Sequence, residues 1–222
     1  MAAMETRASQ FLSCVFAMAA ALLGASASQA TGFTVHSYQL GERIALTNGT
    51  RVWTAQLDVS VENLVSHVPS FCVDVFSPIT VGQYDARGIL DADTAVAPTD
   101  ERARNFAWAG HVMETFGGDV ASLVSSGITR AQAVTGVQAA IWQGIYGGKM
   151  VNRTSLSVGA RAVYDRIMRT QDSGVGDALI VELRGRQDQV LIGPRAIPEP
   201  SAALVFGLGT LVAGSALRRR AA

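Results

Sequence analysis

Residues 134–148, VTGVQAAIWQGIYGG, have the pattern of a helix that ends in glycines. Its apolar residues recur about every three to four positions, and Gln138 lies in the middle of the stripe that they form. A primary amide that faces a core loses its hydrogen bonds to water and must find a partner inside the protein. Gln138 therefore indicates either a buried polar network or chemistry, and the rest of the sequence has to decide between them.

Helical signals surround this stretch. Thr129 and Gln132 have the form of a capping box, so the helix is expected to begin there and to end at Gly147 and Gly148. Asp100 is expected to cap an earlier helix. The predicted helices besides the Gln138 helix cover residues 100–116, 120–125 and 161–169.

Strand signals lie on both sides of the helical segment. The dipeptides Asn48-Gly49 and Gly185-Arg186 are expected to form the turns of two hairpins. The predicted strands cover residues 33–40, 43–47, 51–61, 70–76, 79–84, 178–183 and 187–192. Strands, then helices, then strands predict an α+β domain: a β-sandwich or barrel-like sheet with a helical insertion that contains the Gln138 helix.

The alternation of apolar and polar residues is clearest from Arg51 onward. Trp53 and Leu57 belong to the apolar face, whereas Thr54 and Gln56 belong to the polar face. This pattern predicts a half-buried strand with its polar face in solvent.

The N-terminal end has the features of a secretory signal. Residues 1–30 combine Arg7, an apolar run from Phe11 to Leu23, and small residues that suit cleavage. Export is therefore expected, and residues 1–30 are excluded from the fold. Residues 31–196 then form one domain of ordinary size.

The C-terminal end, residues 197–222, has a sorting pattern of its own. Pro198, Glu199 and Pro200 precede a short apolar run and a cluster of arginines. This order resembles the PEP-CTERM tail of exported bacterial proteins. The resemblance implies transient anchoring in the inner membrane, processing by an exosortase-type enzyme, and a final place at the cell surface or in the extracellular matrix. A plain membrane anchor is the alternative.

Charge and cysteine content narrow the function classes. The chain has 18 basic and 18 acidic residues, and between the two terminal signals the charge is near balance without a basic run, which argues against a nucleic-acid partner. Cys14 lies in the signal, so Cys72 is the single cysteine of the mature protein. A lone cysteine in an exported domain is a buried apolar side chain, a partner in an intermolecular disulfide, or a reactive thiol.

The sequences FCV at residues 71–73 and VQAAIW at residues 137–142 resemble the two signatures of the thioester domains of bacterial surface adhesins. That resemblance implies an internal thioester, with Cys72 as the thiol partner and Gln138 as the acyl partner. It differs at one position, because the adhesin motif often has threonine where this chain has valine. The residues expected to pack around the bond are Phe71, Ile141 and Trp142.

The resemblance implies a covalent tether rather than an enzyme. An amine or hydroxyl on a protein or polysaccharide surface would attack the acyl group once, without a cofactor. A surface or matrix protein of the same fold that acts without the bond is the alternative. A cysteine hydrolase would need one of His36, His67 or His111 beside the thiol. These histidines are isolated in the sequence, so no metal site is expected.

Overall fold

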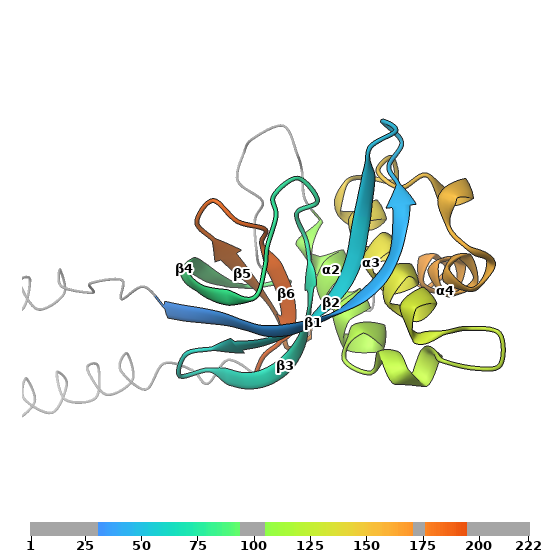
Figure 1. The fold of residues 1–222 in the computed structure, drawn as a ribbon. Helices are drawn as coiled ribbons and strands as arrows, with labels where there is room; N and C mark the ends of the chain where they lie inside the picture. The colour runs from blue at the N-terminus through green and yellow to red at the C-terminus, as the bar shows by residue number, and fades with distance from the viewer. Residues whose placement is uncertain (1–30, 94–104, 171–175, 195–222) are drawn as a thin grey trace, which may run out of the picture. The chain divides into compact units, whose positions relative to one another are not determined.

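The computed structural model describes residues 31–93, 105–170 and 176–194 of the chain (Figure 1). The predicted signal, the sorting motif Pro198-Glu199-Pro200 and the predicted cap Asp100 lie outside these residues. The described part begins in a strand and ends in a strand, with the helices between them.

Six antiparallel strands close into a barrel in the order β1-β2-β3-β6-β5-β4. The strands are β1 (Thr31–Ala45), β2 (Arg51–Val61), β3 (Val65–Cys72), β4 (Gly82–Asp91), β5 (Ala178–Leu183) and β6 (Gln189–Ile192). The strands that precede and follow the helices in sequence therefore share one sheet, with β3 paired to β6. The predicted α+β class is confirmed, and the sheet takes the barrel form.

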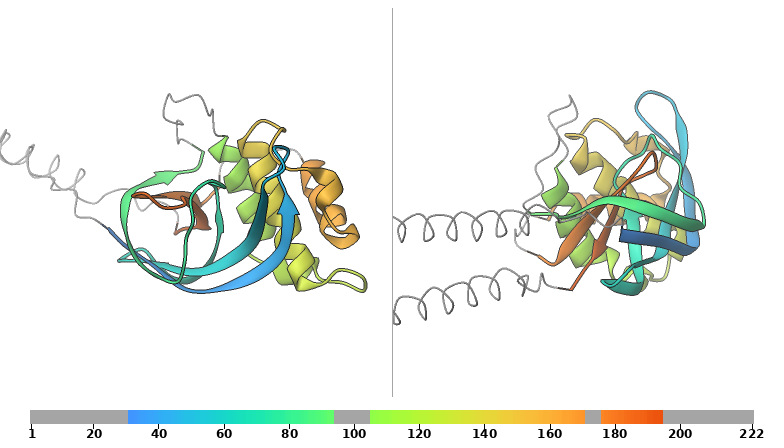
Figure 2. Two further views of the ribbon diagram at one scale, coloured as in Figure 1. Left: turned by 45° about the horizontal axis from the view of Figure 1, so that its top comes forward. Right: turned by 90° about the vertical axis from the view of Figure 1, so that its left-hand side faces the viewer.

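The helices gather against one side of the barrel (Figures 1 and 2). They are α2 (Phe106–Val112), the π-helix η1 (Met113–Gly117), the short 3-10 helices η2 (Val120–Leu123) and η3 (Arg153–Ser155), α3 (Arg130–Ile145) and α4 (Val158–Met168). Helix α3 packs on β1 and β2 and is flanked by α2 and α4. It is therefore covered on several sides, and its buried residues extend all around it.

The ends of α3 confirm the local prediction. Thr129 accepts a hydrogen bond from the Gln132 backbone, and the Gln132 side chain accepts one from the Thr129 backbone. Gly147 and Gly148 follow the helix with φ angles of 67° and 83°, a conformation that glycine adopts without strain. The earlier described helix begins at Phe106, where Asn105 caps the Trp108 N–H at 3.0 Å.

The prediction for β2 was wrong about its polar face. Thr54 and Gln56 are buried, because α3 and the turn at Gly117 cover that side of the strand. Their side chains are hydrogen-bonded there, as buried polar groups require. Trp53, predicted on the apolar face, is 59% exposed.

The boundaries of two strands differ from the prediction. Residues 33–40 and 43–47 were expected as separate strands, but β1 runs continuously to Ala45 with register shifts that absorb its irregularities. The strand predicted for residues 70–76 ends at Cys72. Asp74 accepts hydrogen bonds from the Phe76 N–H and the Ser77 hydroxyl, and this local turn replaces ladder pairing.

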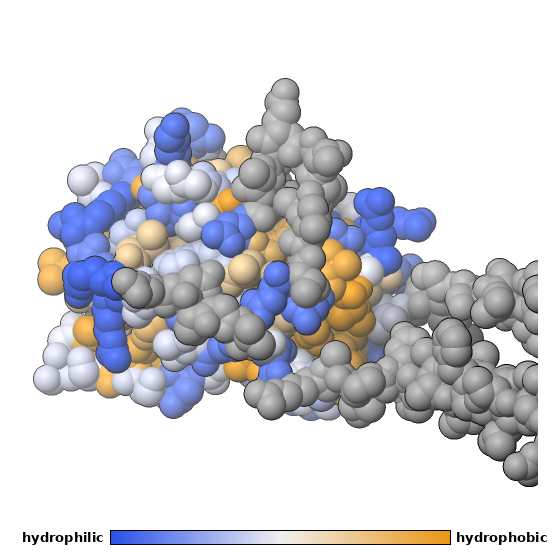
Figure 3. Space-filling model, turned by 180° about the vertical axis from the view of Figure 1, so that it is seen from behind, coloured by the Kyte–Doolittle hydropathy of each residue, from blue (hydrophilic) through white to orange (hydrophobic). Residues whose placement is uncertain are grey.

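The hairpin of β5 and β6 forms as predicted, with Gly185 at φ 65° in its turn. Seen from behind, the surface mixes hydrophilic residues with several hydrophobic groups (Figure 3). Within the described residues, every helix is too short or too polar to span a bilayer.

Candidate functional site

The structure brings Cys72 and Gln138 together. Cys72 is the last residue of β3, and Gln138 lies in the middle of α3. The Cys72 backbone N–H donates to Gln138 Oε1 at 3.2 Å, and Gln138 Nε2 donates to the Cys72 carbonyl oxygen at 2.7 Å. The carboxamide therefore bonds both backbone groups of Cys72, as a neighbouring strand would. The Gln138 side chain is fully buried.

Small residues allow α3 to approach its neighbours closely enough to hold this contact. A side chain at Gly136 would place its Cβ 2.5 Å from Cβ of Val163 on α4. Ala139 and Ala140, directly after Gln138, are fully buried. The helix is therefore held between the barrel wall and α4, which fixes the position of the Gln138 side chain.

The side chain of Cys72 is buried, with 5% of the residue exposed. Its hydrogen-bond partner is Gln189 on β6, whose Nε2 donates to Sγ at 3.4 Å. Burial raises the pKa of the Cys72 thiol to about 12; the Gln189 hydrogen bond opposes this rise and the nearby charge of Asp74 adds to it. The thiol is therefore protonated at neutral pH, and its nucleophilic thiolate form is scarce.

Gln189 is a site residue that the sequence interpretation did not identify. It is fully buried, and it also accepts a hydrogen bond from the Ser70 hydroxyl at 3.1 Å. A signal was present, because Gln189 stands beside the apolar run of β6. An amide in an apolar segment needs a hydrogen-bond partner, at Gln189 as at Gln138.

The chain after Cys72 is fixed by polar contacts around Asp74. Besides its bonds to Phe76 and Ser77, the Asp74 side chain accepts a hydrogen bond from the Tyr146 hydroxyl at 3.4 Å. The Gln187 side chain donates to the Asp74 carbonyl oxygen. These contacts connect the segment after β3 to the end of α3 and to the β5–β6 turn, so both sides of the Cys72–Gln138 contact are supported.

A pocket of about 600 Å³ lies over the pair, and Cys72 and Gln138 both line it. None of its lining residues has a charged side chain. Exposed aromatic rings contribute to its wall, with Tyr38 at 53% and Trp53 at 59% exposure. The pair is thus buried but next to a neutral, partly apolar space that a partner group could enter.

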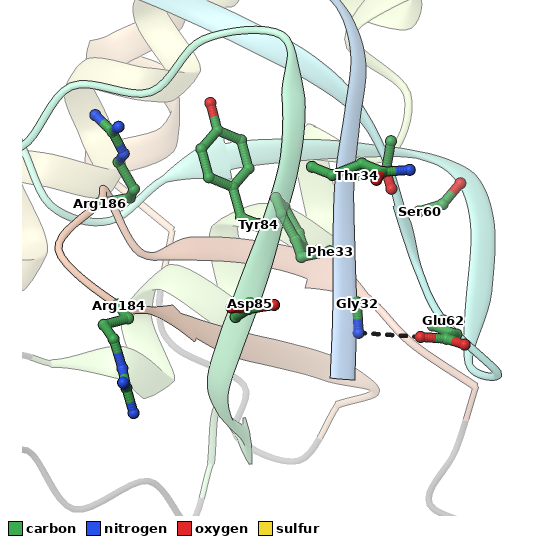
Figure 4. Close-up of a pocket in the computed structure, with 10 residues that line it drawn as sticks. Gly32, Phe33, Thr34, Ser60, Glu62, Tyr84, Asp85, Arg184 and Arg186 are labelled. Atoms are coloured by element: carbon green, nitrogen blue, oxygen red, sulfur yellow. Dashed lines mark hydrogen bonds between the residues drawn. The ribbon is translucent and has the colours of Figure 1, made fainter. Parts of the chain in front are cut away.

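A second pocket, of about 710 Å³, has a different chemistry (Figure 4). It lies where β1 begins, and its lining includes charged residues, among them Glu62, Asp85 and Arg184. Glu62 accepts a hydrogen bond from the Gly32 N–H at 3.3 Å. Cys72 and Gln138 do not line this pocket.

The residues predicted to pack around the pair are buried. Phe71 and Ile141 are fully buried, and Trp142 is 2% exposed and lines the pocket over the pair. Val137, where the adhesin motif often has threonine, is also fully buried. The hydroxyl of that motif is therefore replaced here by an apolar contact.

The histidines have other partners. His36 contacts the Ser60 hydroxyl at 2.7 Å, and His67 contacts Asp58 at 3.1 Å. His111 contacts the Thr170 hydroxyl at 3.2 Å. The hydrogen-bond partner of the Cys72 sulfur is the Gln189 amide and not one of these histidines. Among the described residues, no group of three or more His, Cys, Asp or Glu side chains could hold a metal ion.

Comparisons with known proteins give one distant structural likeness. No family model matches the chain, and no curated protein matches it. The fold is similar to the N-terminal thioester domain of the fibronectin-binding protein SfbI from Streptococcus pyogenes, at 9% sequence identity and a TM-score of 0.44. The match covers 76% of this chain and 95% of that domain. At this similarity the chemistry of the site rests on its own geometry.

Proposed function

We propose that the protein forms an internal thioester between Cys72 Sγ and the side-chain carbon Cδ of Gln138, and that it uses this bond once to attach to a partner. The supporting observation is the pair of hydrogen bonds that hold the Gln138 carboxamide against Cys72 in the interior. These bonds orient the acyl carbon beside the residue that supplies the nucleophile, which removes much of the entropic cost of the reaction.

The bond forms by condensation. The Cys72 thiol adds to Cδ of Gln138, a carbon–sulfur bond forms, and the carbon–nitrogen bond breaks. The amide nitrogen leaves as ammonia, taking up the thiol proton. The Cys72 N–H already donates to Oε1, so it is in place to stabilise the negative charge that develops on this oxygen. Gln189 donates to the sulfur and favours its thiolate form.

Attachment is the second acyl transfer at the same carbon. An amine or hydroxyl of the partner enters through the neutral pocket and adds to Cδ, and the carbon–sulfur bond breaks. The proton of the nucleophile passes to the sulfur, which becomes a free thiol, while the partner stays attached to Gln138. Each molecule reacts once, so the protein acts as an adhesin or matrix cross-linker and not as an enzyme, and it needs no cofactor.

Placement outside the cell completes this proposal. The signal pattern of residues 1–30 and the tail of residues 197–222 support export, anchoring in the inner membrane and processing by an exosortase-type enzyme. The mature protein would then act at the cell surface or in the extracellular matrix. Amines and hydroxyls of proteins and polysaccharides are abundant there.

One observation also fits a second function, that of a surface or matrix protein without the thioester. The Gln138 amide is hydrogen-bonded to backbone through both its oxygen and its nitrogen, as a purely structural core amide would be. In that case the protein is a surface or matrix protein that acts by non-covalent contact through the same fold. The two functions differ in the covalent state of the purified protein.

Intact mass spectrometry of the purified mature protein tests the proposal. The thioester form is lighter than the calculated chain by one ammonia, and methylamine adds to it with release of the Cys72 thiol. Cys72→Ala and Gln138→Ala should abolish both effects. Gln143→Ala is the matched control, because Gln143 is on the same helix but bonds to the backbone of residues 148, 150 and 151. A wild-type protein at its full calculated mass would favour the non-covalent function.

A further inference from the structure

Trp142 has a buried N–H group that no hydrogen bond satisfies. Among the described residues and their contacts, its indole Nε1 is closed to solvent and lacks an acceptor. An unpaired buried donor destabilises the folded state, and native structures rarely leave one. Its presence beside a reactive pair therefore calls for an acceptor that exists only in another state of the molecule.

The position of Trp142 indicates where that acceptor arises. Trp142 follows Gln138 by one helical turn, so both side chains lie on the same face of α3. Trp142, Gln138 and Cys72 line the same pocket. A group from outside does not readily reach the nitrogen, because the atom is closed to solvent. The acceptor is thus expected to come from the pair itself.

Trp108 is a second buried tryptophan, and its indole N–H does have a hydrogen-bond acceptor. Its Nε1 donates to the carbonyl oxygen of Ala140 on α3 at 2.9 Å. Both indoles are buried, Trp108 against α3 and Trp142 on it, but within the described part of the chain the Trp142 N–H has no acceptor. The difference sets Trp142 apart from ordinary core packing.

We infer that the Trp142 indole N–H is a catalytic donor that stabilises the tetrahedral intermediate formed at Gln138. This inference rests on the proposed thioester. When the sulfur adds to Cδ, the electron pair of the carbonyl bond moves to Oε1 and makes it an oxyanion. Trp142 then donates to this oxygen together with the Cys72 N–H, until the intermediate collapses and ammonia leaves. The same two donors act when an amine adds and the sulfur leaves.

A donor that is free before the reaction suits this task. Within the described residues the resting amide oxygen accepts from the Cys72 N–H and not from Trp142, so the second N–H gains its partner only as negative charge develops. An interaction made only in the transition state lowers the barrier without stabilising the resting state.

Trp142→Phe in the full mature chain is the direct test, because it keeps an aromatic ring and removes the N–H. Two rates are measured by mass: loss of ammonia after refolding, and addition of methylamine to the thioester. Both should fall on the order of 10²-fold, the usual effect of removing one oxyanion donor. Thermal unfolding should show that Trp142→Phe remains folded. Benzothienylalanine at position 142, which replaces the N–H by sulfur and retains the ring shape, should lower both rates in the same way.

Trp108→Phe is the matched control. It removes a paired indole N–H, so it should lower the melting temperature while both rates stay near those of wild type. Wild-type rates in Trp142→Phe and in the benzothienylalanine protein would overturn the role of Trp142 while leaving the thioester intact. A wild-type protein that never loses ammonia would overturn the proposed function, and this inference with it.

Discussion

The barrel wall under α3 and the barrel end at the start of β1 handle polar groups in opposite ways. Under α3, the side chains of Gln138 and Gln189 are fully buried and hydrogen-bonded, and the adjoining pocket is free of charged side chains. At the barrel end, charged side chains such as Arg184 line the pocket (Figure 4). The same small domain thus contains a region of buried, hydrogen-bonded amides beside a neutral pocket and a region whose pocket is lined by charges.

The difference indicates where bond-making chemistry is feasible. A thioester at the barrel end would lie among charged groups, whereas the region under α3 buries the reacting residues and fixes their positions. Each buried polar group under α3 also depends on its specific partner. Substitutions should therefore have large effects under α3 and small effects at the barrel end.

Gln138→Ala should have the largest effect on stability. Compared with protein in which Gln138 is still an amide, this variant removes the partners of the buried N–H and C=O of Cys72 and opens a cavity, so the free energy of unfolding should fall by about 3 kcal/mol. Urea unfolding measures this change. Gln143→Ala, on the less buried side of the same helix, should cost only about 1 kcal/mol. Equal losses in the two variants would show that the site region is not specially constrained.

Gly136→Ala should have the next largest effect. The new Cβ would lie 2.5 Å from Cβ of Val163 and 2.8 Å from the backbone oxygen of Ala160, so α3 and α4 must move apart. Overpacking of this kind costs about 2 kcal/mol. Adding Val163→Gly to Gly136→Ala removes both side-chain atoms that the new Cβ meets, so the two losses should be less than additive, as for coupled neighbours. Additive losses in the double variant would place the strain elsewhere.

Alkaline pH should lower the stability of the folded protein by a smaller amount. The effect requires Cys72 to be a free thiol, either because the thioester has not formed or because methylamine has opened it. The pKa of this thiol is raised from 9.0 to about 12 in the folded protein. The folded state keeps the proton where the unfolded chain loses it, so stability is unaffected below pH 9 and falls as the pH rises from 9 toward 12. By pH 10 the loss should be about 1 kcal/mol.

The control for this pH effect is Cys72→Ala, which has no thiol to titrate. Chemical unfolding of both proteins at pH 8 and pH 10 isolates the contribution of the thiol as the difference between them. A difference that stays constant over this range would contradict burial as the cause of the raised pKa. The charged side chains of the barrel-end pocket cancel in this difference, because both proteins contain them.

Arg184→Ala should have the smallest effect. Its side chain is exposed at the barrel end, and exposed substitutions usually change stability by less than about 0.5 kcal/mol. Ammonia loss and methylamine addition should also be unchanged, since the pocket over the pair has a separate lining. A large loss of stability or of reactivity in this variant would break the contrast between the two regions.

Local signals made much of the fold predictable. The capping box at Thr129, the glycines after α3 and the turn at Gly185 all depend on neighbours within a few residues, and all are found as expected. The end of β3 was missed, although Asp74 forms its turn locally. The buried face of β2 was missed for another reason, because alternation along one strand does not reveal what packs on its polar side.

The sequence by itself determined the α+β class, the order of the elements and the helix on which Gln138 lies, because these follow from periodicity, capping and turn residues. Through resemblance it also indicated Cys72 as the partner of Gln138. Only the tertiary structure decided that β3 and β6 pair, which brings Gln189 to the sulfur, and that the Trp142 N–H has no acceptor among the residues that the structure describes. These contacts join residues far apart in the chain, and they depend on how barrel and helices pack rather than on any local pattern.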